Sequence, residues 1–329
     1  MTILVTGGAG YIGSHAVEHL LNAGQSVVVA DNLFRGHREA VHPDAKLYEV
    51  DLAETDQLAQ IMRTHSVSGV MHFAALTYVG ESVDQPIWYY ANNTGGTASL
   101  LRAMETAGVN RFVFSSTCAT YGEPDELPIV ETISQHPINP YGQSKLFVEQ
   151  MLKDKVATDN EFSFIALRYF NVAGCSLGGR IGEDHDPETH LIPIVLQVAL
   201  GQRERVQVFG TDYPTPDGTC IRDYIHVDDL CAAHLLAMES LKPGEGNFYN
   251  LGIGKGYSVR EVIESVKRVT GKDIPATEVD RREGDPPELF ANADKLRGEL
   301  GWKPNVPDLD DIVRSAWDWF QAHPNGYAS

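Results

Sequence analysis

Tyr141 and Lys145, in the stretch Pro140–Lys145, are a pair of residues whose types and spacing could support acid–base chemistry. On a helix, side chains four residues apart lie on one face, so the ammonium can sit beside the phenol. A free tyrosine titrates near ~10, and a neighbouring positive charge lowers that pKa until the phenolate can take a proton from an alcohol. The spacing predicts such a pair, although tyrosine and lysine at this spacing can also simply pack together.

The N-terminal segment has the order of a dinucleotide-binding unit. A hydrophobic strand within Thr2–Gly8 runs into a glycine turn, a helical pattern follows to Gly24, and a second strand, Val27–Asp31, ends in an acid. Glycines let the backbone approach a pyrophosphate, and the helix N-terminus offers free N–H donors. The acid can accept hydrogen bonds from the adenosine ribose and would repel a 2′-phosphate, which favours NAD over NADP. The glycines Gly7, Gly10 and Gly13 are spaced Gly-x-x-Gly-x-x-Gly.

The composition is that of an ordinary globular protein. Of 329 residues, 43% are hydrophobic and 22% charged, and the net charge of −19 disfavours a nonspecific nucleic-acid or anionic-membrane binder. The sequence lacks a long apolar run and a signal peptide, so we expect a cytoplasmic protein. The four cysteines have no paired metal spacing and the twelve histidines are scattered, so the sequence predicts reduced cysteines and no metal site.

Strand and helix patterns alternate along the first half of the chain. Strands are predicted at Lys46–Leu52, Gly69–Ala75, Arg111–Thr117 and Phe162–Phe170, with helices over about Thr55–His65, Gln85–Ala107 and Tyr141–Val156. This alternation predicts an α/β fold, a doubly wound parallel-sheet Rossmann domain with a smaller mixed α/β substrate-binding domain. We expect residues 1–174 to form the first domain, with returning segments at roughly 220–255, and residues 175–329 to form mainly the second.

Several further motifs, read with the glycine turn and the Tyr–Lys pair, point to one family. The chain resembles the extended short-chain dehydrogenase/reductase superfamily and, more narrowly, its UDP-glucose 4-epimerases. The motifs are Thr6–Gly13, Asp31–Leu33, His72–Ala75, Val79–Ser82, Tyr89–Asn93, Ser115–Thr117, Tyr121-Gly122, Arg168–Asn171, Phe209–Pro214 and Arg222–Val227. The resemblance runs from residue 2 to about residue 320.

The resemblance implies redox-neutral interconversion of UDP-glucose and UDP-galactose. The sugar C4 alcohol is oxidised to a 4-keto sugar with bound NAD, and the ketone turns over and is reduced from its other face. Tyr141 would exchange the O4 proton, Thr117 would hydrogen-bond O4, and Lys145 would hold the nicotinamide ribose and lower the tyrosine pKa. Thr117 could instead be an ordinary strand residue.

The resemblance also assigns contacts by position. Arg222 and Arg282 are predicted to bind the UDP diphosphate because guanidinium pairs bidentately with phosphate. Asp285 would bind the uridine ribose, and residues 191 and 207–209 would border uracil. The NAD contacts are Gly7, Gly10, Tyr11, Ile12, Gly13, Asp31, Asn32, Asp51, Leu52, Phe73, Ala74, Ala75, Thr77, Asn92, Tyr141, Lys145 and Phe170. The substrate contacts are Thr117, Tyr141, Asn171, His190, Leu191, Gln207, Val208, Phe209, Arg222, Tyr224, Arg282, Asp285 and Leu289.

Three positions depart from the family pattern. Thr77 stands where some members have lysine, and His190 stands where asparagine is frequent. Leu289 stands at the position that lines the sugar pocket. Asp51, Arg282 and Leu289 could also be a turn acid, a surface arginine and a core leucine.

The same fold also occurs in proteins with other functions. A nucleotide-sugar 4,6-dehydratase needs Asp-Glu after the strand threonine, where this chain has Cys118-Ala119. A 4-epimerase of UDP-N-acetylhexosamines or UDP-pentoses is a closer alternative; a net dehydrogenase or a non-catalytic NAD-binding regulator fits less well. The resemblance also suggests a homodimer, with residues 85–107 and 141–156 as candidate interface.

Overall fold

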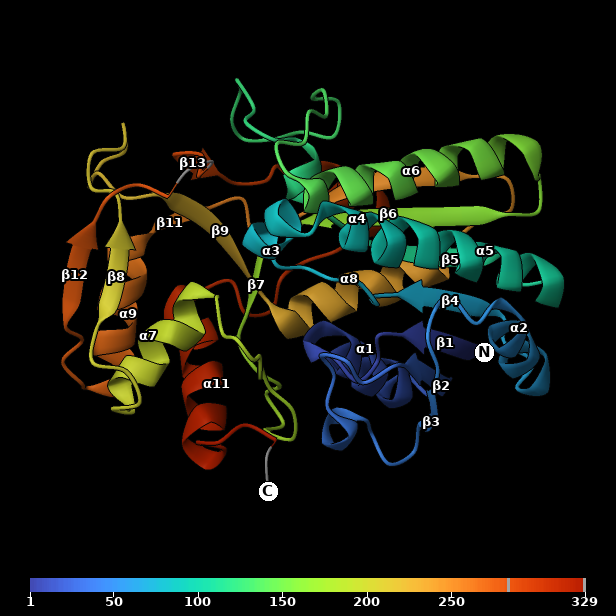
Figure 1. The fold of residues 1–329 in the computed structure, drawn as a ribbon, viewed down its shortest axis with the longest axis horizontal. Helices are drawn as coiled ribbons and strands as arrows, with labels where there is room; N and C mark the ends of the chain where they lie inside the picture. Colours follow the sequence, from blue (N-terminus) through green and yellow to red (C-terminus); the bar gives the residue numbers. More distant parts are fainter. Residues whose placement is uncertain (283–284, 328–329) are drawn as a thin grey trace.

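The computed structural model describes residues 1–282 and 285–327 and is built around a seven-stranded parallel sheet (Figure 1). The strand order is β10-β6-β5-β4-β1-β2-β3, and every neighbouring pair is parallel. This order confirms the predicted doubly wound sheet, and its edge strand β10 comes from late in the chain. The strands are β1 (Thr2–Thr6), β2 (Ser26–Asp31), β3 (Lys46–Glu49), β4 (Gly69–His72), β5 (Arg111–Thr117), β6 (Ser163–Tyr169) and β10 (Gly246–Leu251).

Helices cover both faces of this sheet. Because side chains alternate along a strand, Val5 and Val29 pack into a core with α1 and α8, whereas Leu4 and Val28 pack into the opposite core with α2, α5 and α6. Burial on both faces explains why these strands are continuously hydrophobic. The helices are α1 (Tyr11–Asn22), α2 (Thr55–Thr64), α3 (Val79–Asp84), α5 (Gly96–Ala107), α6 (Pro140–Thr158) and α8 (Val227–Ser240), with short 3₁₀ turns η1 (Arg38–Ala40) and η3 (Cys118–Thr120).

The single helix predicted over residues 85–107 is interrupted. It consists of α4 (Pro86–Tyr89), a π-helical turn η2 (Tyr90–Gly95) and α5. The turn directs the buried Asn93 side chain inward, where its Nδ2 donates to the Leu76 carbonyl oxygen at 2.9 Å and to Ser144 Oγ at 3.0 Å, and its Oδ1 accepts from the Leu76 N–H at 2.8 Å. These long-range bonds, which sequence periodicity cannot reveal, hold the loop after β4 against α6.

The second part of the chain is the predicted mixed α/β region, on the left of Figure 1. Strand β9 (Ile221–His226) pairs with β7 (Asn171–Ala173), β11 (Gly256–Ser258) and β13 (Glu288–Leu289), and β8 (Val206–Phe209) pairs with β12 (Ala276–Val279). The helices are α7 (Leu191–Ala199), α9 (Val259–Thr270), α10 (Asp294–Leu300) and α11 (Leu309–Ala322). Among the described residues, no helix has the length and apolar character needed to cross a membrane.

Candidate active site

The end of β5 and the first turn of α6 bring the three predicted catalytic residues together. Thr117 is the last residue of β5, and Tyr141 and Lys145 lie on one face of α6. The Lys145 ammonium nitrogen lies 6.0 Å from the Tyr141 ring centroid and donates a hydrogen bond of 2.9 Å to the carbonyl oxygen of Ser115. The structure therefore assembles a phenol, an ammonium and a hydroxyl at the carboxyl edge of the sheet.

Local sequence fixes the start of α6 beside this strand end. The Asn139 side chain caps the helix by accepting from the Gly142 N–H at 2.8 Å, and Pro140 occupies the first helical turn. A Cβ at Gly142 would lie 2.4 Å from the Ala119 carbonyl oxygen, so only glycine allows this approach. The cap and the glycine together place Tyr141 against the residues that follow Thr117.

Burial, not the lysine, dominates the titration of the pair. Although part of Tyr141 remains exposed, desolvation by the surrounding protein raises the pKa of its phenol to about 12, and a hydrogen bond with Thr117 only partly opposes this. Burial lowers the pKa of Lys145 to about 7. Without a bound cofactor the lysine does not offset the effect of burial, so its lowering of the tyrosine pKa stays a prediction. A positive charge from outside the protein would lower this pKa further.

A buried ion pair supports α6 from behind the site. Glu149, one turn beyond Lys145, accepts from Arg168 Nε at 2.9 Å and from Arg168 Nη2 at 2.6 Å, and also from Ser116 Oγ at 2.6 Å. This network joins α6 to β5 and β6. Sequence analysis missed Glu149, although its helical spacing of four from Lys145 was a signal.

The glycine turn after β1 forms a cradle for a diphosphate. Gly7 has φ +74, and a Cβ there would lie 2.5 Å from the Ala74 backbone nitrogen; a Cβ at Gly13 would lie 2.0 Å from the Gly7 carbonyl oxygen. Gly10 precedes α1 and, as a glycine, leaves the first helical N–H groups, including those of Tyr11 and Ile12, without a side-chain cap. Such a close-packed turn with free donors fits the pyrophosphate of a dinucleotide.

The acid after β2 is held in place by the backbone. Asp31 is 7% exposed, and its carboxylate accepts from the N–H groups of Ala9 at 2.9 Å and Leu33 at 2.8 Å. Burial raises the pKa of Asp31, and the two backbone N–H groups oppose that rise. Next to Asp31 in the chain, Asn32 donates from Nδ2 to Asp51 Oδ2 at 2.8 Å. Asn32 and Asp51, both predicted to contact NAD, therefore lie together.

Arg35 is the basic residue that could favour a 2′-phosphate in this region, but it is already engaged. Its Nη2 donates to Glu81 Oε1 at 2.8 Å, and its guanidinium lies 4.1 Å from the Tyr78 ring centroid. The arginine therefore does not oppose the NAD preference expected from Asp31.

The other predicted cofactor residues lie along the same edge of the sheet or beside it. Phe73, Ala74 and Ala75 follow β4, with Thr77 exposed farther along, while half-buried Asn92 lies on η2. Leu52 packs against Gly96 of α5, and Phe170, 9% exposed, follows β6. In parallel α/β sheets this carboxyl edge is where ligands bind.

The predicted substrate residues converge on β9. Asn171 of β7 is in register with Tyr224, and Leu289 of β13 is in register with Arg222. Arg222 Nη2 forms an ion pair of 3.3 Å with Asp285, so the residues predicted to bind the diphosphate and the uridine ribose lie side by side.

The predicted uracil and diphosphate residues near β8 differ in accessibility. Exposed Arg282 lies 4.5 Å over the Phe209 ring, and Gln207 is exposed. Val208, in contrast, is 2% exposed and packs with Tyr224 in the core of the second part. The strand alternation turns the Val208 side chain inward, so a contact of this residue with uracil through its backbone stays a prediction.

The loop before α7 contains a group that sequence analysis did not anticipate. Leu191 begins α7 and His190 precedes it, and Glu183, His185 and Glu188 surround the His190 ring. The signal in the sequence was the spacing Glu-x-His-x-x-Glu-x-His.

Comparison with known proteins decides the family. Residues 3–252 match the NAD dependent epimerase/dehydratase family. The chain belongs to this family. It is 54% identical to a UDP-glucose 4-epimerase of Halalkalibacterium halodurans, covering 100% of this chain and 98% of the relative. It is 51% identical to that of Lacticaseibacillus casei, covering 99% of each.

A solved member of the family gives the same picture. The UDP-glucose 4-epimerase from Bifidobacterium longum, determined in complex with NAD+ and UDP, superimposes with a TM-score of 0.95 at 40% identity, covering 99% of this chain and 100% of that one. As a member of an NAD-dependent family, this chain uses NAD, and the glycine cradle and Asp31 fit that cofactor.

Proposed function

We propose that this protein interconverts UDP-glucose and UDP-galactose by transient oxidation at C4. The observation that carries the proposal is that Thr117, Tyr141 and Lys145 meet at the sheet edge of a chain similar over its full length to UDP-glucose 4-epimerases. Bound NAD supplies the acceptor and later donor of the hydride, and its oxidised ring brings a positive charge. That charge is the external contribution that the Tyr141 phenol needs to ionise.

The protein groups handle the proton. The Tyr141 phenolate accepts the O4 proton as C4 is oxidised and returns it after the ketone has turned in the site, while the Thr117 hydroxyl orients O4. Lys145 fixes its own position beside Tyr141 by donating a hydrogen bond to the Ser115 carbonyl oxygen. Because the proton and the hydride both return to the sugar, the reaction is redox-neutral.

A 4,6-dehydratase is not supported. It requires an ionisable acid–base pair after Thr117, and the chain has Cys118-Ala119 there. Burial raises the pKa of the Cys118 thiol to about 12, so that side chain stays neutral near pH 7 and cannot act as the missing base.

The substrate-binding roles are part of the proposal. We assign the UDP diphosphate to Arg222 and Arg282, the uridine ribose to Asp285, and the uracil to Leu191 and residues 207–209. Asn171 would lie between the nicotinamide and the substrate phosphate, His190 would contact the substrate, and Leu289 would line the sugar pocket. The division into a nucleotide domain of residues 1–174, with segments from 220–255, and a substrate domain of residues 175–329 belongs to this proposal.

A cytoplasmic homodimer is part of the proposal. Ile87 is 75% exposed and Phe147 is 45% exposed, and both lie on the helices expected to pair two subunits. Light scattering should give the mass of two chains for the wild type and of one chain for Phe147→Glu; a monomeric wild type would contradict the assignment.

Incubation of the purified protein with UDP-galactose and no added NAD tests the activity. We expect UDP-glucose as the product, with no stoichiometric release of NADH. Formation of a 4-keto-6-deoxy sugar nucleotide, or accumulation of free NADH, would assign a different reaction.

A further inference from the structure

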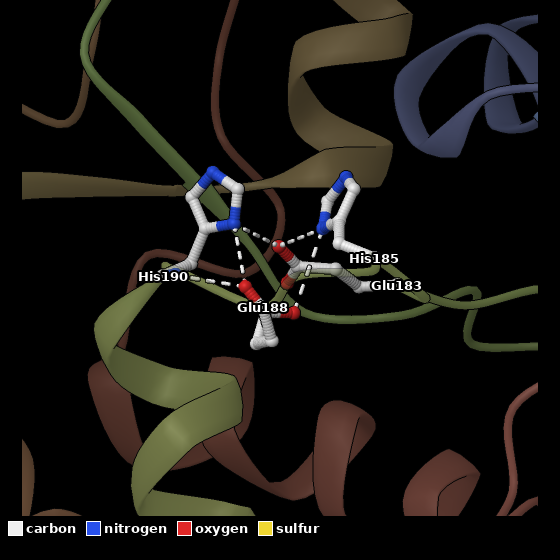
Figure 2. A group of neighbouring side chains, drawn as sticks. All are labelled: Glu183, His185, Glu188 and His190. Carbon is white, nitrogen blue, oxygen red and sulfur yellow. Dashed lines mark hydrogen bonds and ion pairs between the residues drawn. The ribbon is translucent and has the colours of Figure 1, made fainter. Parts of the chain in front are cut away.

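The loop between β7 and α7 gathers two carboxylates and two imidazoles (Figure 2). Glu183, His185, Glu188 and His190, here called the 183–190 cluster, have ligand atoms that all lie within 4.8 Å of one another. Figure 2 shows both rings turning one nitrogen toward the carboxylates and the other away. The distances of the ion pairs identify the inward nitrogens as Nδ1.

The spacing within the 183–190 cluster is that of metal ligands. His185 Nδ1 lies 3.4 Å from Glu183 Oε1 and 3.5 Å from Glu188 Oε2, and His190 Nδ1 lies 3.2 Å from Glu183 Oε1 and 2.8 Å from Glu188 Oε1. Around Zn²⁺, bonds of about 2.0–2.1 Å in a tetrahedron put neighbouring ligand atoms about 3.3 Å apart. Three of the four distances match this edge, and only the shortest has hydrogen-bond geometry.

Two buried atoms of the 183–190 cluster face each other without forming a hydrogen bond. Glu183 is 2% exposed, and its Oε1 lies 3.4 Å from His185 Nδ1 as an ion pair, but neither atom has a partner with hydrogen-bond geometry among the described residues. Both atoms point into the space between the two carboxylates and the two rings, so a single cation there would satisfy them together.

We propose that the 183–190 cluster binds a zinc ion. The neighbouring carboxylates raise the pKa of His185 to about 10, so zinc binding would displace the proton from its Nδ1. Two deprotonated imidazole nitrogens and two carboxylate oxygens then make a four-ligand set, and the two carboxylates balance the charge of the ion. Mg²⁺ and Ca²⁺ fit less well because they take oxygen ligands in larger number. The sequence predicts no metal; the four residues meet only because the loop folds back on itself ahead of α7.

The position of the zinc site gives it a structural consequence. The His185 ring packs edge-on against the Tyr11 ring at 6.0 Å, at the start of α1, and His190 is the residue before α7. The ion therefore ties the nucleotide turn to the helix that begins with Leu191. With Nδ1 on the metal, His190 must carry its proton on Nε2, which leaves a fixed N–H donor on a side chain that is 40% exposed.

Metal content of the holoenzyme tests the zinc site directly. Untagged protein, expressed in medium that contains zinc and then dialysed, should contain one zinc ion per chain. Inductively coupled plasma mass spectrometry measures this ratio. After removal by a chelator, Co²⁺ should restore the intense visible absorption of a tetrahedral site. A wild-type protein that retains no zinc and gives only the weak spectrum of octahedral Co²⁺ would overturn the proposal.

Matched variants locate the ion. Glu183→Gln keeps the size of the side chain and removes its charge, so zinc affinity in competition with a chelator should fall by at least about 10–100-fold. His42→Gln is the control, because His42 pairs with a carboxylate that is not part of the cluster, its Nδ1 lying 3.8 Å from Asp44; this variant should bind zinc like the wild type. Equal zinc affinity in Glu183→Gln would refute the assignment, and the wild-type Co²⁺ spectrum decides if that variant does not fold.

Discussion

Lys145 and Tyr141 lie on one face of α6, with the ammonium nitrogen 6.0 Å from the tyrosine ring centroid, yet the pKa of the phenol is about 12. A neighbouring cation should lower that pKa, but burial lowers the pKa of the lysine to about 7 and weakens its effect. The Tyr141 phenol therefore stays protonated near pH 7 unless a further positive charge is present. Bound oxidised NAD supplies such a charge, which links proton transfer to the state of the cofactor.

Replacing Tyr141 by phenylalanine tests the base. The ring is kept while the ionisable hydroxyl is lost, so kcat should fall by at least ~10²-fold, the usual scale of general acid–base catalysis, while the Kd for UDP changes little. Steady-state kinetics and calorimetry give the two quantities. Tyr48→Phe is the control and should keep full turnover. It also removes a tyrosine hydroxyl, but that hydroxyl bonds His65 Nε2 at 2.7 Å and is not part of the site.

Lys145→Met separates two roles of the lysine. If its charge helps to ionise Tyr141, the variant should be slow at pH 7 and recover about 10-fold per pH unit as the pH rises, because the phenolate fraction rises tenfold per unit below its pKa. The pH profile of kcat from pH 7 to 10 measures this recovery. A low and pH-independent rate would mean that Lys145 acts only by holding the cofactor ribose and the end of β5.

Asp31 should control the choice between NAD and NADP. Asp31→Asn keeps the shape of the side chain and removes the charge that repels a 2′-phosphate. Its single oxygen can accept from only one of the N–H groups of Ala9 and Leu33, which donate to different oxygens of the aspartate. The ratio of the NADP Kd to the NAD Kd, measured on cofactor-stripped protein, should fall at least about 10-fold, roughly 1.4 kcal/mol. An unchanged ratio would remove Asp31 from cofactor selection.

Leu289 is the residue expected to limit the size of the sugar substituent. It packs against the small apolar cluster that includes Phe170, and it is in register with Arg222. UDP-glucose and UDP-galactose should be preferred over UDP-N-acetylhexosamines by a margin on the order of 1–3 kcal/mol. Leu289→Tyr should suppress kcat/KM for the N-acetyl sugars selectively. Equal losses for both substrate classes would identify it as an ordinary packing residue.

His72 should make the protein less stable in acid. Its ring packs against Phe112 and Phe114. Its Nδ1 lies 2.6 Å from Thr6 Oγ1 and its Nε2 2.8 Å from Thr97 Oγ1. Burial lowers the pKa of this ring from 6.5 to about 3. Between those values the unfolded chain binds a proton that the folded chain excludes. This contribution to the free energy of unfolding is therefore full above pH 6.5 and falls by about 1.4 kcal/mol per unit as the pH drops.

Urea unfolding across this pH range measures that loss. His72→Gln should unfold more easily at neutral pH but show a shallower pH dependence, by about 1.4 kcal/mol per unit. His136→Gln changes an exposed ring and should follow the wild type. Equal slopes in all three proteins would show that His72 takes up its proton in the folded state.

Features that depend on neighbouring residues, such as a strand, a tight turn or the face of a helix, could be predicted from the sequence. The strand predicted at Arg111–Thr117 has those bounds, because a run of buried β-forming residues ends where the chain turns. The glycine turn follows equally from local rules, since only glycine tolerates the φ of +74 at Gly7 and the contact at Gly13. The face shared by Tyr141 and Lys145 follows from helical spacing alone.

Tertiary structure alone decided the features that depend on distant residues. Asn93 interrupts the predicted helix over 85–107 because its bonds reach Leu76 and Ser144, which lie elsewhere in the chain. The pKa of Tyr141 depends on how much protein surrounds it, and desolvation is a property of the packed fold. Likewise, Glu183 and His190 meet in an irregular loop without a repeating period, so spacing in the sequence could not place their side chains around one point.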